Sequence, residues 1–120
     1  MEFLAVLAIA IGSWLHVPGG SWNPDAQQVT QARSQLESYI SRSARLAGET
    51  LPAWDSYTFQ YQGREQGGKQ VIVVNAFCGT PPSFADVEWV EVFDGGACYF
   101  NAYWDPVEKV YVSVQFNGHA

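Results

Sequence analysis

The chain has 120 residues, which is enough for one domain with a single modest core. Hydrophobic residues make up 48% of it and charged residues only 15%, a balance that excludes a disordered tail, a coiled coil and a low-complexity linker. Six basic residues stand against twelve acidic ones, for a formal net charge of −6. The basic stripe that nucleic-acid binding requires is missing, so we expect no nucleic acid as a partner.

The N-terminal segment is apolar from residue 3 to residue 17, with His16 as its only titratable side chain. This run is shorter than the roughly 20 apolar residues of a membrane-spanning helix and close in length to the apolar region of a signal peptide. A Pro-Gly-Gly-Ser sequence at 18–21 interrupts any helix. We therefore expect residues 1–20 to be a signal peptide or a membrane anchor, with residues 3–17 as the part that would contact a membrane.

Two features differ from a routine signal peptide. No Lys or Arg precedes the apolar run, and the small-residue cleavage site is indistinct, with Ala8-Ile9-Ala10 and Gly19-Gly20-Ser21 as candidates. A buried core helix is the alternative interpretation, although the run lacks the one-sided apolar stripe of a surface helix. The expected location is exported, either periplasmic or extracellular, with the leader cleaved or kept as an anchor.

The next segment predicts one amphipathic helix over residues 24–47. Asn23 can cap the helix, Pro24 suits the first helical position, and Asp25 lies where the helix dipole favours an anion. Gly48 provides the stop signal. Apolar residues recur at three- and four-residue spacing on one stripe, namely Val29, Ala32, Leu36, Tyr39, Ile40, Ala44 and Ala47.

After Pro52 the period of the apolar residues changes from 3.6 to 2, which is typical of strands. The predicted strands are Ser56–Gln62, Gln70–Phe77, Val87–Phe93, Ala97–Trp104 and Lys109–Phe116. A glycine-rich loop at 63–68, a tight turn at 94–96 and an Asp-Pro turn at 105–106 separate most of them. The order predicts an α+β fold in one domain over residues 21–120, with the N-terminal helix packed on a four- to five-stranded antiparallel sheet.

Cys78 and Cys98 are the only cysteines, and an even count in a small exported chain favours a disulfide. Two free buried thiols, or a metal or redox pair, are the alternatives. Closing a loop of about twenty residues would stabilise the fold by roughly 3 kcal/mol. A simple meander of the predicted strands places the two cysteines at opposite ends of the sheet, beyond the reach of a disulfide. Either the connection at 79–86 crosses the sheet, or the meander is wrong, or the thiols are free; we expect the disulfide and doubt the meander.

Pairing across the predicted turns assigns the side chains of the last three strands to two faces. The aliphatic face, expected under the helix, carries Val90, Val92, Tyr99, Val110, Val112, Val114 and Phe116. The opposite face is both aromatic and polar, which is typical of a recognition surface. Its candidate binding residues are Trp89, Glu91, Phe100, Trp104 and Tyr111. A bulge would exchange the two faces of a strand.

Candidates for catalysis are few. The only histidines are His16 and His119, so nucleophilic catalysis has no convincing base. Glu91, placed among aromatic side chains, is the one acid that burial could tune for proton transfer. The acids have no metal-binding spacing and the glycines no phosphate-binding pattern, so we expect no metal and no cofactor.

Four further residues are expected to have structural roles. Asn75 lies in an apolar strand and must find hydrogen-bond partners if it is buried, so we expect it to brace the turn around the two cysteines. Asp94, Gly95 and Gly96 are expected to form the tight turn before the second cysteine.

Three segments together resemble a group of small exported bacterial proteins of uncharacterised function. They are Val74–Cys78 (Val-Asn-Ala-Phe-Cys), Asp94–Phe100 (Asp-Gly-Gly-Ala-Cys-Tyr-Phe) and Phe116–Ala120 (Phe-Asn-Gly-His-Ala). The resemblance covers about residues 54–120, including the Tyr-rich strand at 57–63. It implies a bacterial envelope or secreted protein and supplies no activity. The layout is also similar to the cystatin-like arrangement of a helix and an antiparallel sheet, but the Gln-x-Val-x-Gly inhibitory loop of cystatins is absent, so protease inhibition is not implied.

Three functional hypotheses follow. The first is an exported, non-catalytic binding or interaction domain that uses the aromatic sheet face to hold a protein or a small ligand. The second is an accessory subunit of a membrane-associated complex, anchored by residues 3–17. The third is a small hydrolase or isomerase-type enzyme with Glu91 in an aromatic pocket.

Overall fold

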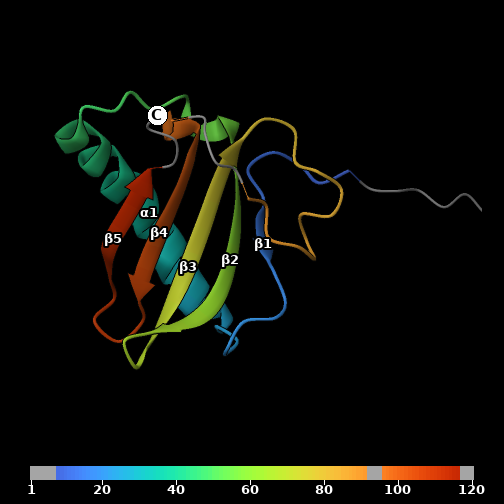
Figure 1. Ribbon diagram of the computed structural model, residues 1–120, viewed down its shortest axis with the longest axis vertical. Helices are drawn as coiled ribbons and strands as arrows, with labels where there is room; N and C mark the ends of the chain where they lie inside the picture. Colours follow the sequence, from blue (N-terminus) through green and yellow to red (C-terminus); the bar gives the residue numbers. More distant parts are fainter. Residues whose placement is uncertain (1–7, 92–95, 117–120) are drawn as a thin grey trace, which may run out of the picture.

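The computed structural model describes residues 8–91 and 96–116. One long helix, α1 (Ala26–Ala47), lies across one face of a five-stranded sheet, which confirms the predicted α+β fold (Figure 1). In sheet order the strands are β1 (Trp14–His16), β2 (Tyr57–Gln66), β3 (Lys69–Cys78), β4 (Tyr99–Asp105) and β5 (Val110–Phe116). The last four pair antiparallel with their neighbours, whereas β1 runs parallel to β2, so the sheet is mixed.

The helix forms where its end signals and its apolar stripe predict it. It begins two residues later than expected because Asp25, and not Asn23, is the N-cap. The Asp25 carboxylate accepts a hydrogen bond from the Gln28 backbone N–H at 2.8 Å, and the Gln28 side chain accepts one from the Asp25 N–H at 2.9 Å, which together make a capping box. Gly48 ends the helix with a φ of +72°, a conformation that glycine adopts without a Cβ penalty.

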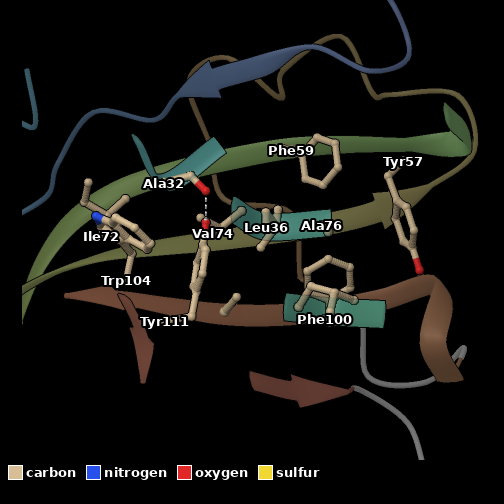
Figure 2. Packing of buried hydrophobic residues seen from close by; sticks show 12 residues of the cluster. Ala32, Leu36, Tyr57, Phe59, Ile72, Val74, Ala76, Phe100, Trp104 and Tyr111 are labelled. Atoms are coloured by element: carbon tan, nitrogen blue, oxygen red, sulfur yellow. Dashed lines mark hydrogen bonds between the residues drawn. The ribbon is translucent and has the colours of Figure 1, made fainter. Parts of the chain in front are cut away.

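The helix stripe packs on the aromatic face of the sheet. Figure 2 shows Ala32 and Leu36 of the helix lying over side chains of the neighbouring strands. The Tyr111 hydroxyl donates a hydrogen bond to the Ala32 carbonyl at 2.5 Å, which ties β5 to the middle of the helix. The buried cluster consists of Ala32, Leu36, Ile40, Tyr57, Phe59, Ile72, Val74, Ala76, Phe100, Ala102, Trp104 and Tyr111.

The structure therefore reverses the predicted faces for β4 and for the start of β5, whereas Val114 and Phe116 pack against the core as expected. Phe100, Trp104 and Tyr111, expected on a recognition surface, are buried beneath the helix, while Val110 and Val112, expected beneath it, are exposed. A bulge in the pairing of β4 with β5, between Tyr103 and Trp104, is one cause, because it exchanges the faces of the residues that follow. The other cause is that the described residues 87–91 do not form the expected strand before β4.

The predicted strand Val87–Phe93 is not formed over the residues that the structure describes, 87–91, which run as turn and irregular chain. Consequently β3 pairs directly with β4, with Phe77 opposite Tyr99. Cys78 and Cys98 thereby become neighbours at one end of the sheet, with their Cα atoms 5.2 Å apart, and the predicted disulfide is confirmed. The predicted meander, which placed the strand Val87–Phe93 between β3 and β4, is therefore wrong, as doubted, because these two strands are direct antiparallel neighbours.

The hairpin between β2 and β3 is tighter than predicted. The expected loop at 63–68 shrinks to a two-residue turn, because Gln66 already pairs with Lys69. Gly67 and Gly68 form that turn with φ values of +57° and +80°, the left-handed conformations that a two-residue hairpin turn requires. Both strands are therefore longer than the predicted Ser56–Gln62 and Gln70–Phe77.

Part of the apolar N-terminal segment belongs to the folded body. β1 forms the edge of the sheet beside β2, and Val17 behind it is buried. The chain then bridges to β2 at Trp22 and Gly63, so closely that a Cβ on Gly63 would lie 2.2 Å from the Trp22 carbonyl oxygen. The folded body thus includes residues that the sequence analysis assigned to the leader. Among the described residues, no helix has the length and apolarity needed to cross a membrane.

Candidate functional site

The five predicted binding residues do not share one surface. Phe100, Trp104 and Tyr111 lie in the core. Trp89 is half-buried in the connection between β3 and β4, and the guanidinium carbon of Arg64 lies 4.4 Å from its ring centroid. Glu91 is exposed and lines neither of the cavities described below.

Asn75 belongs to a row of three amide side chains on the face of the sheet away from the helix. Gln60, Asn75 and Asn101 are directly opposite one another on β2, β3 and β4. The Asn75 amide nitrogen donates to the Gln60 side-chain oxygen at 2.9 Å, and the Asn101 amide nitrogen donates to the Asn75 side-chain oxygen at 2.9 Å. The buried amides thus satisfy one another across the strands.

This amide row also holds the connection between β3 and β4 against the sheet. Gln60 donates to the carbonyls of Ala85 and Glu88 at 2.8 and 2.7 Å, and Asn75 donates to the Val90 carbonyl at 2.7 Å. The Val90 N–H donates back to the Gln60 oxygen at 2.9 Å. Asn75 therefore fixes this connection at Val90 rather than bracing the cysteines, which corrects the expected role. These bonds occupy backbone groups that a strand over 87–93 would have used.

The expected tight turn is only partly visible. Asp94 and Gly95 lie outside the described residues. Gly96 begins the short 3-10 helix η2 (Gly96–Cys98) with a φ of +58°. The Tyr57 hydroxyl donates to the Ala97 carbonyl, so β2 fixes this helix next to the disulfide.

A cleft of about 250 Å³ lies between the helix, the chain entering β1 and the short 3-10 helix η1 (Trp54–Ser56). We call it the aromatic cleft. Its lining residues are Gly12, Trp14, Arg33, Ser34, Glu37, Trp54, Asp55 and Phe59.

The floor of the aromatic cleft is a row of three rings. Trp14 stacks on Phe59 with ring centroids 5.1 Å apart and planes at 26°, and Trp54 contacts Phe59 with ring centroids 5.4 Å apart and planes at 39°. Phe59 is buried, while both indoles are half-buried. Because each indole is half-buried and packs against Phe59, its position is fixed. The part of each ring that stays exposed is therefore a preorganised apolar surface.

The rim of the aromatic cleft is charged. Arg33, Ser34 and Glu37 project from one side of the helix, next to the buried stripe, and Asp55 projects from η1. The guanidinium carbon of Arg33 lies 5.7 Å from the ring centroid of Trp14, a cation–π contact. Within residues 8–91 and 96–116, no hydrogen bond or ion pair engages the carboxylate of Glu37 or of Asp55. Both therefore retain their capacity to accept hydrogen bonds from a ligand.

A second cavity, of about 290 Å³, lies between the two hairpin turns that join β2 to β3 and β4 to β5. Its carboxylate, Asp105, is already engaged in its own turn, where it accepts hydrogen bonds from the N–H groups of Val107 and Glu108 at 2.9 and 3.0 Å. These bonds lower the pKa of Asp105. No aromatic side chain lines this cavity, so it offers less to a ligand than the aromatic cleft.

Most of the aromatic cleft is not predicted from the sequence. Trp14 lies in the segment assigned to the leader, and Trp54 and Asp55 lie between the predicted helix and the first predicted strand. The available signal was the pair Arg33 and Glu37, which lie four residues apart and flank the buried stripe of the helix. No group of three or more His, Cys, Asp or Glu side chains in the described part of the chain could hold a metal ion.

Comparison with known proteins gives no functional lead. No protein-family model matches the chain, and no curated protein or solved structure matches it either. The resemblance to small exported bacterial proteins therefore stays a prediction, and a functional argument has to start from the aromatic cleft.

Proposed function

We propose that the protein is an exported, non-catalytic binding domain and that the aromatic cleft is its ligand site. One observation carries the proposal: two half-buried indole rings and four polar side chains converge on the same small cleft. A concave site with an apolar floor and a few placed polar groups is what small-ligand binding needs. The binding surface thus moves from the aromatic sheet face to the edge of the sheet beside β1.

The enzyme hypothesis has no comparable support. It depended on Glu91 lying inside an aromatic pocket, where burial could tune it for proton transfer. Glu91 is instead exposed. We therefore favour binding over catalysis.

Export is part of the proposal. The disulfide between Cys78 and Cys98 is compatible with an oxidising compartment. Cleavage after Ala10 would leave β1 intact, including the hydrogen bond of 2.9 Å from the Phe59 N–H to the Ser13 carbonyl. Cleavage after Ser21 would instead remove β1 and the buried Val17. Of the two candidate sites, we therefore propose the first.

Intact-mass measurement of the protein produced with its own N-terminus in a bacterial host tests the export step. The expected result is a chain that has lost residues 1–10 and retains the disulfide. A mature chain beginning at Trp22, or a full-length chain left in the cytosol with free thiols, would contradict the proposal. A full-length chain in the membrane fraction would favour the anchored accessory subunit instead.

Tryptophan fluorescence tests the binding step. The probes are one neutral, one cationic and one anionic trimer: triacetylchitotriose, trilysine and trigalacturonate. We expect a saturable fluorescence change with at least one probe, with an apparent affinity about threefold weaker in Trp54→Phe and unchanged in Trp89→Phe. Trp89 is a matched control because it is also half-buried but lies outside the aromatic cleft. No saturable change with any probe, or a change lost only in Trp89→Phe, would overturn the proposed site.

A further inference from the structure

We infer that the ligand of the aromatic cleft is a neutral saccharide, with one sugar ring held in the cleft and the next along β1. This inference rests on the proposed function of the cleft and names its ligand class. It draws on the charges of the rim, on the size and shape of the cleft, and on aromatic rings that continue beyond it.

The rim carries charges of both signs, so an ionic ligand of either sign meets a like charge there. A cationic group would face Arg33, whose guanidinium already lies over Trp14, one of the two indoles that could attract a cation. An anionic group would face the carboxylates of Glu37 and Asp55. A neutral hydroxyl both donates and accepts, so it can accept from the guanidinium and donate to a carboxylate. A ligand with several hydroxyl groups can therefore hydrogen-bond to Arg33, Glu37 and Asp55 without placing a like charge beside any of them.

The size and shape of the cleft fit one sugar ring. Its volume of about 250 Å³ lies below the range of about 300–1,000 Å³ typical of drug-sized ligands. A pyranose ring has an apolar face of C–H groups and a polar edge of hydroxyls. The half-buried indoles of Trp14 and Trp54 can cover the apolar face, while Arg33, Glu37 and Asp55 can reach the edge. Burial of the C–H groups against an aromatic ring supplies the apolar part of the affinity.

The aromatic rings continue beyond the cleft along the sheet edge. Trp14 contacts Tyr61 with ring centroids 6.2 Å apart, and Tyr61 stacks on His16 at 5.2 Å with planes at 24°. Tyr61 is half-buried and His16 is exposed, so this part of the row is open to solvent. His16 lies on the edge strand β1, and Tyr61 lies opposite it on the neighbouring strand β2 (Figure 1). A second sugar ring can lie there, so an oligosaccharide should bind more tightly than a monosaccharide.

Isothermal titration calorimetry on the mature, disulfide-bonded protein tests the inference with ligands matched in length. The neutral ligands are triacetylchitotriose, cellotriose and maltotriose. The charged ligands are the deacetylated cationic form of the first and trigalacturonate. We expect at least one neutral trisaccharide to bind, at least fivefold more tightly than both charged ones and than its own monosaccharide.

Variants locate the binding. Trp54→Ala should weaken binding of that trisaccharide at least tenfold, and Trp89→Ala should change it less than twofold. If Trp54→Ala does not fold, Trp54→Phe keeps much of the packing against Phe59 and should still weaken binding about threefold. Glu37→Gln should change the affinity less than threefold, because an amide still accepts from a hydroxyl, whereas a cationic ligand would lose far more.

The outcomes separate this inference from the proposed function. If trilysine or the cationic trisaccharide binds in the cleft and no neutral sugar does, the saccharide inference is overturned while the binding function stands. If no probe binds in the cleft, both are overturned. Neutral-sugar binding that Trp54→Phe leaves unchanged and Trp89→Ala abolishes would overturn the assignment to this cleft.

Discussion

Replacement of Asn75 by alanine tests how the outer face of the sheet is covered. Asn75 is 8% exposed and takes part in three hydrogen bonds, with Gln60, Asn101 and the Val90 carbonyl. In the variant the Gln60 oxygen keeps the bond from the Val90 N–H, but the Val90 carbonyl and the Asn101 amide each lose a partner. An unsatisfied buried polar group costs about 1–3 kcal/mol, and Val90 and Asn101 are both half-buried and so at the low end, so we expect a loss of about 2 kcal/mol.

Urea unfolding of Asn75→Ala measures this loss, and hydrogen exchange of the amides at 85–90 locates it. We expect exchange of those amides to increase, because the connection between β3 and β4 loses one of its attachments to the sheet. Gln115→Ala is the matched control, since Gln115 lies opposite Asn101 on β5 but is exposed, and the loss of stability should stay within about 0.5 kcal/mol. Equal stability of Asn75→Ala and wild type, with unchanged exchange, would refute the reasoning.

Three further predictions concern the disulfide, a buried tyrosine and a close backbone approach. Reduction of the bond between Cys78 and Cys98 should lower the free energy of unfolding by about 3 kcal/mol, measured by urea unfolding with and without dithiothreitol; an unchanged midpoint would contradict it. Burial raises the pKa of Tyr57 to about 12, above its ordinary value of 10.0, so its contribution to stability is complete below pH 10 and is lost as pH rises towards about 12. The urea midpoint of unfolding should therefore fall less steeply between pH 9 and pH 12 in Tyr57→Phe than in wild type. The same dependence of the midpoint on pH in both proteins would count against this prediction. Gly63→Ala should lower the free energy of unfolding by about 1–3 kcal/mol, because the added Cβ would lie 2.2 Å from the Trp22 carbonyl oxygen. A melting temperature equal to that of wild type would show that the two backbone segments can move apart without cost.

The features that the sequence predicts correctly are mostly local. The helix follows from its stripe of Ala32, Leu36, Ile40 and Ala44 and from Gly48 at its end, all of which act within a few residues. The disulfide is predicted from the number of cysteines and the expected compartment. The α+β class follows from the change of period after the helix.

The errors arise from interactions between distant segments. Residues 87–91 alternate like a strand, but the amides of Gln60 and Asn75, more than ten residues away, bind their backbone instead. The bulge at Tyr103 and Trp104 depends on how two strands pair, which the period of either strand alone does not encode. The strand at Trp14–His16 lies inside an apolar run, where periodicity cannot separate a buried strand from a helix.

The aromatic cleft could not be predicted for the same reason. Its lining comes from three segments, around Gly12, Arg33 and Asp55, that are adjacent only after the sheet has formed and the helix has packed on it. Sequence patterns identify aromatic residues, but they do not say which rings remain half-exposed. In this fold Phe100, Trp104 and Tyr111 of β4 and β5 are buried, while Trp14 of β1 and Trp54 of η1 remain half-exposed.

The indole N–H signals of the five tryptophans, recorded by NMR during titration with the tightest-binding neutral trisaccharide, test the central claim most directly. Trp14 and Trp54 line the aromatic cleft, whereas Trp22 donates to the Arg64 carbonyl, Trp104 is buried and Trp89 lies under the Arg64 side chain. The account predicts that the signals of Trp14 and Trp54 shift and saturate together while the other three stay in place. A saturable shift of Trp89 with those two unmoved would contradict it.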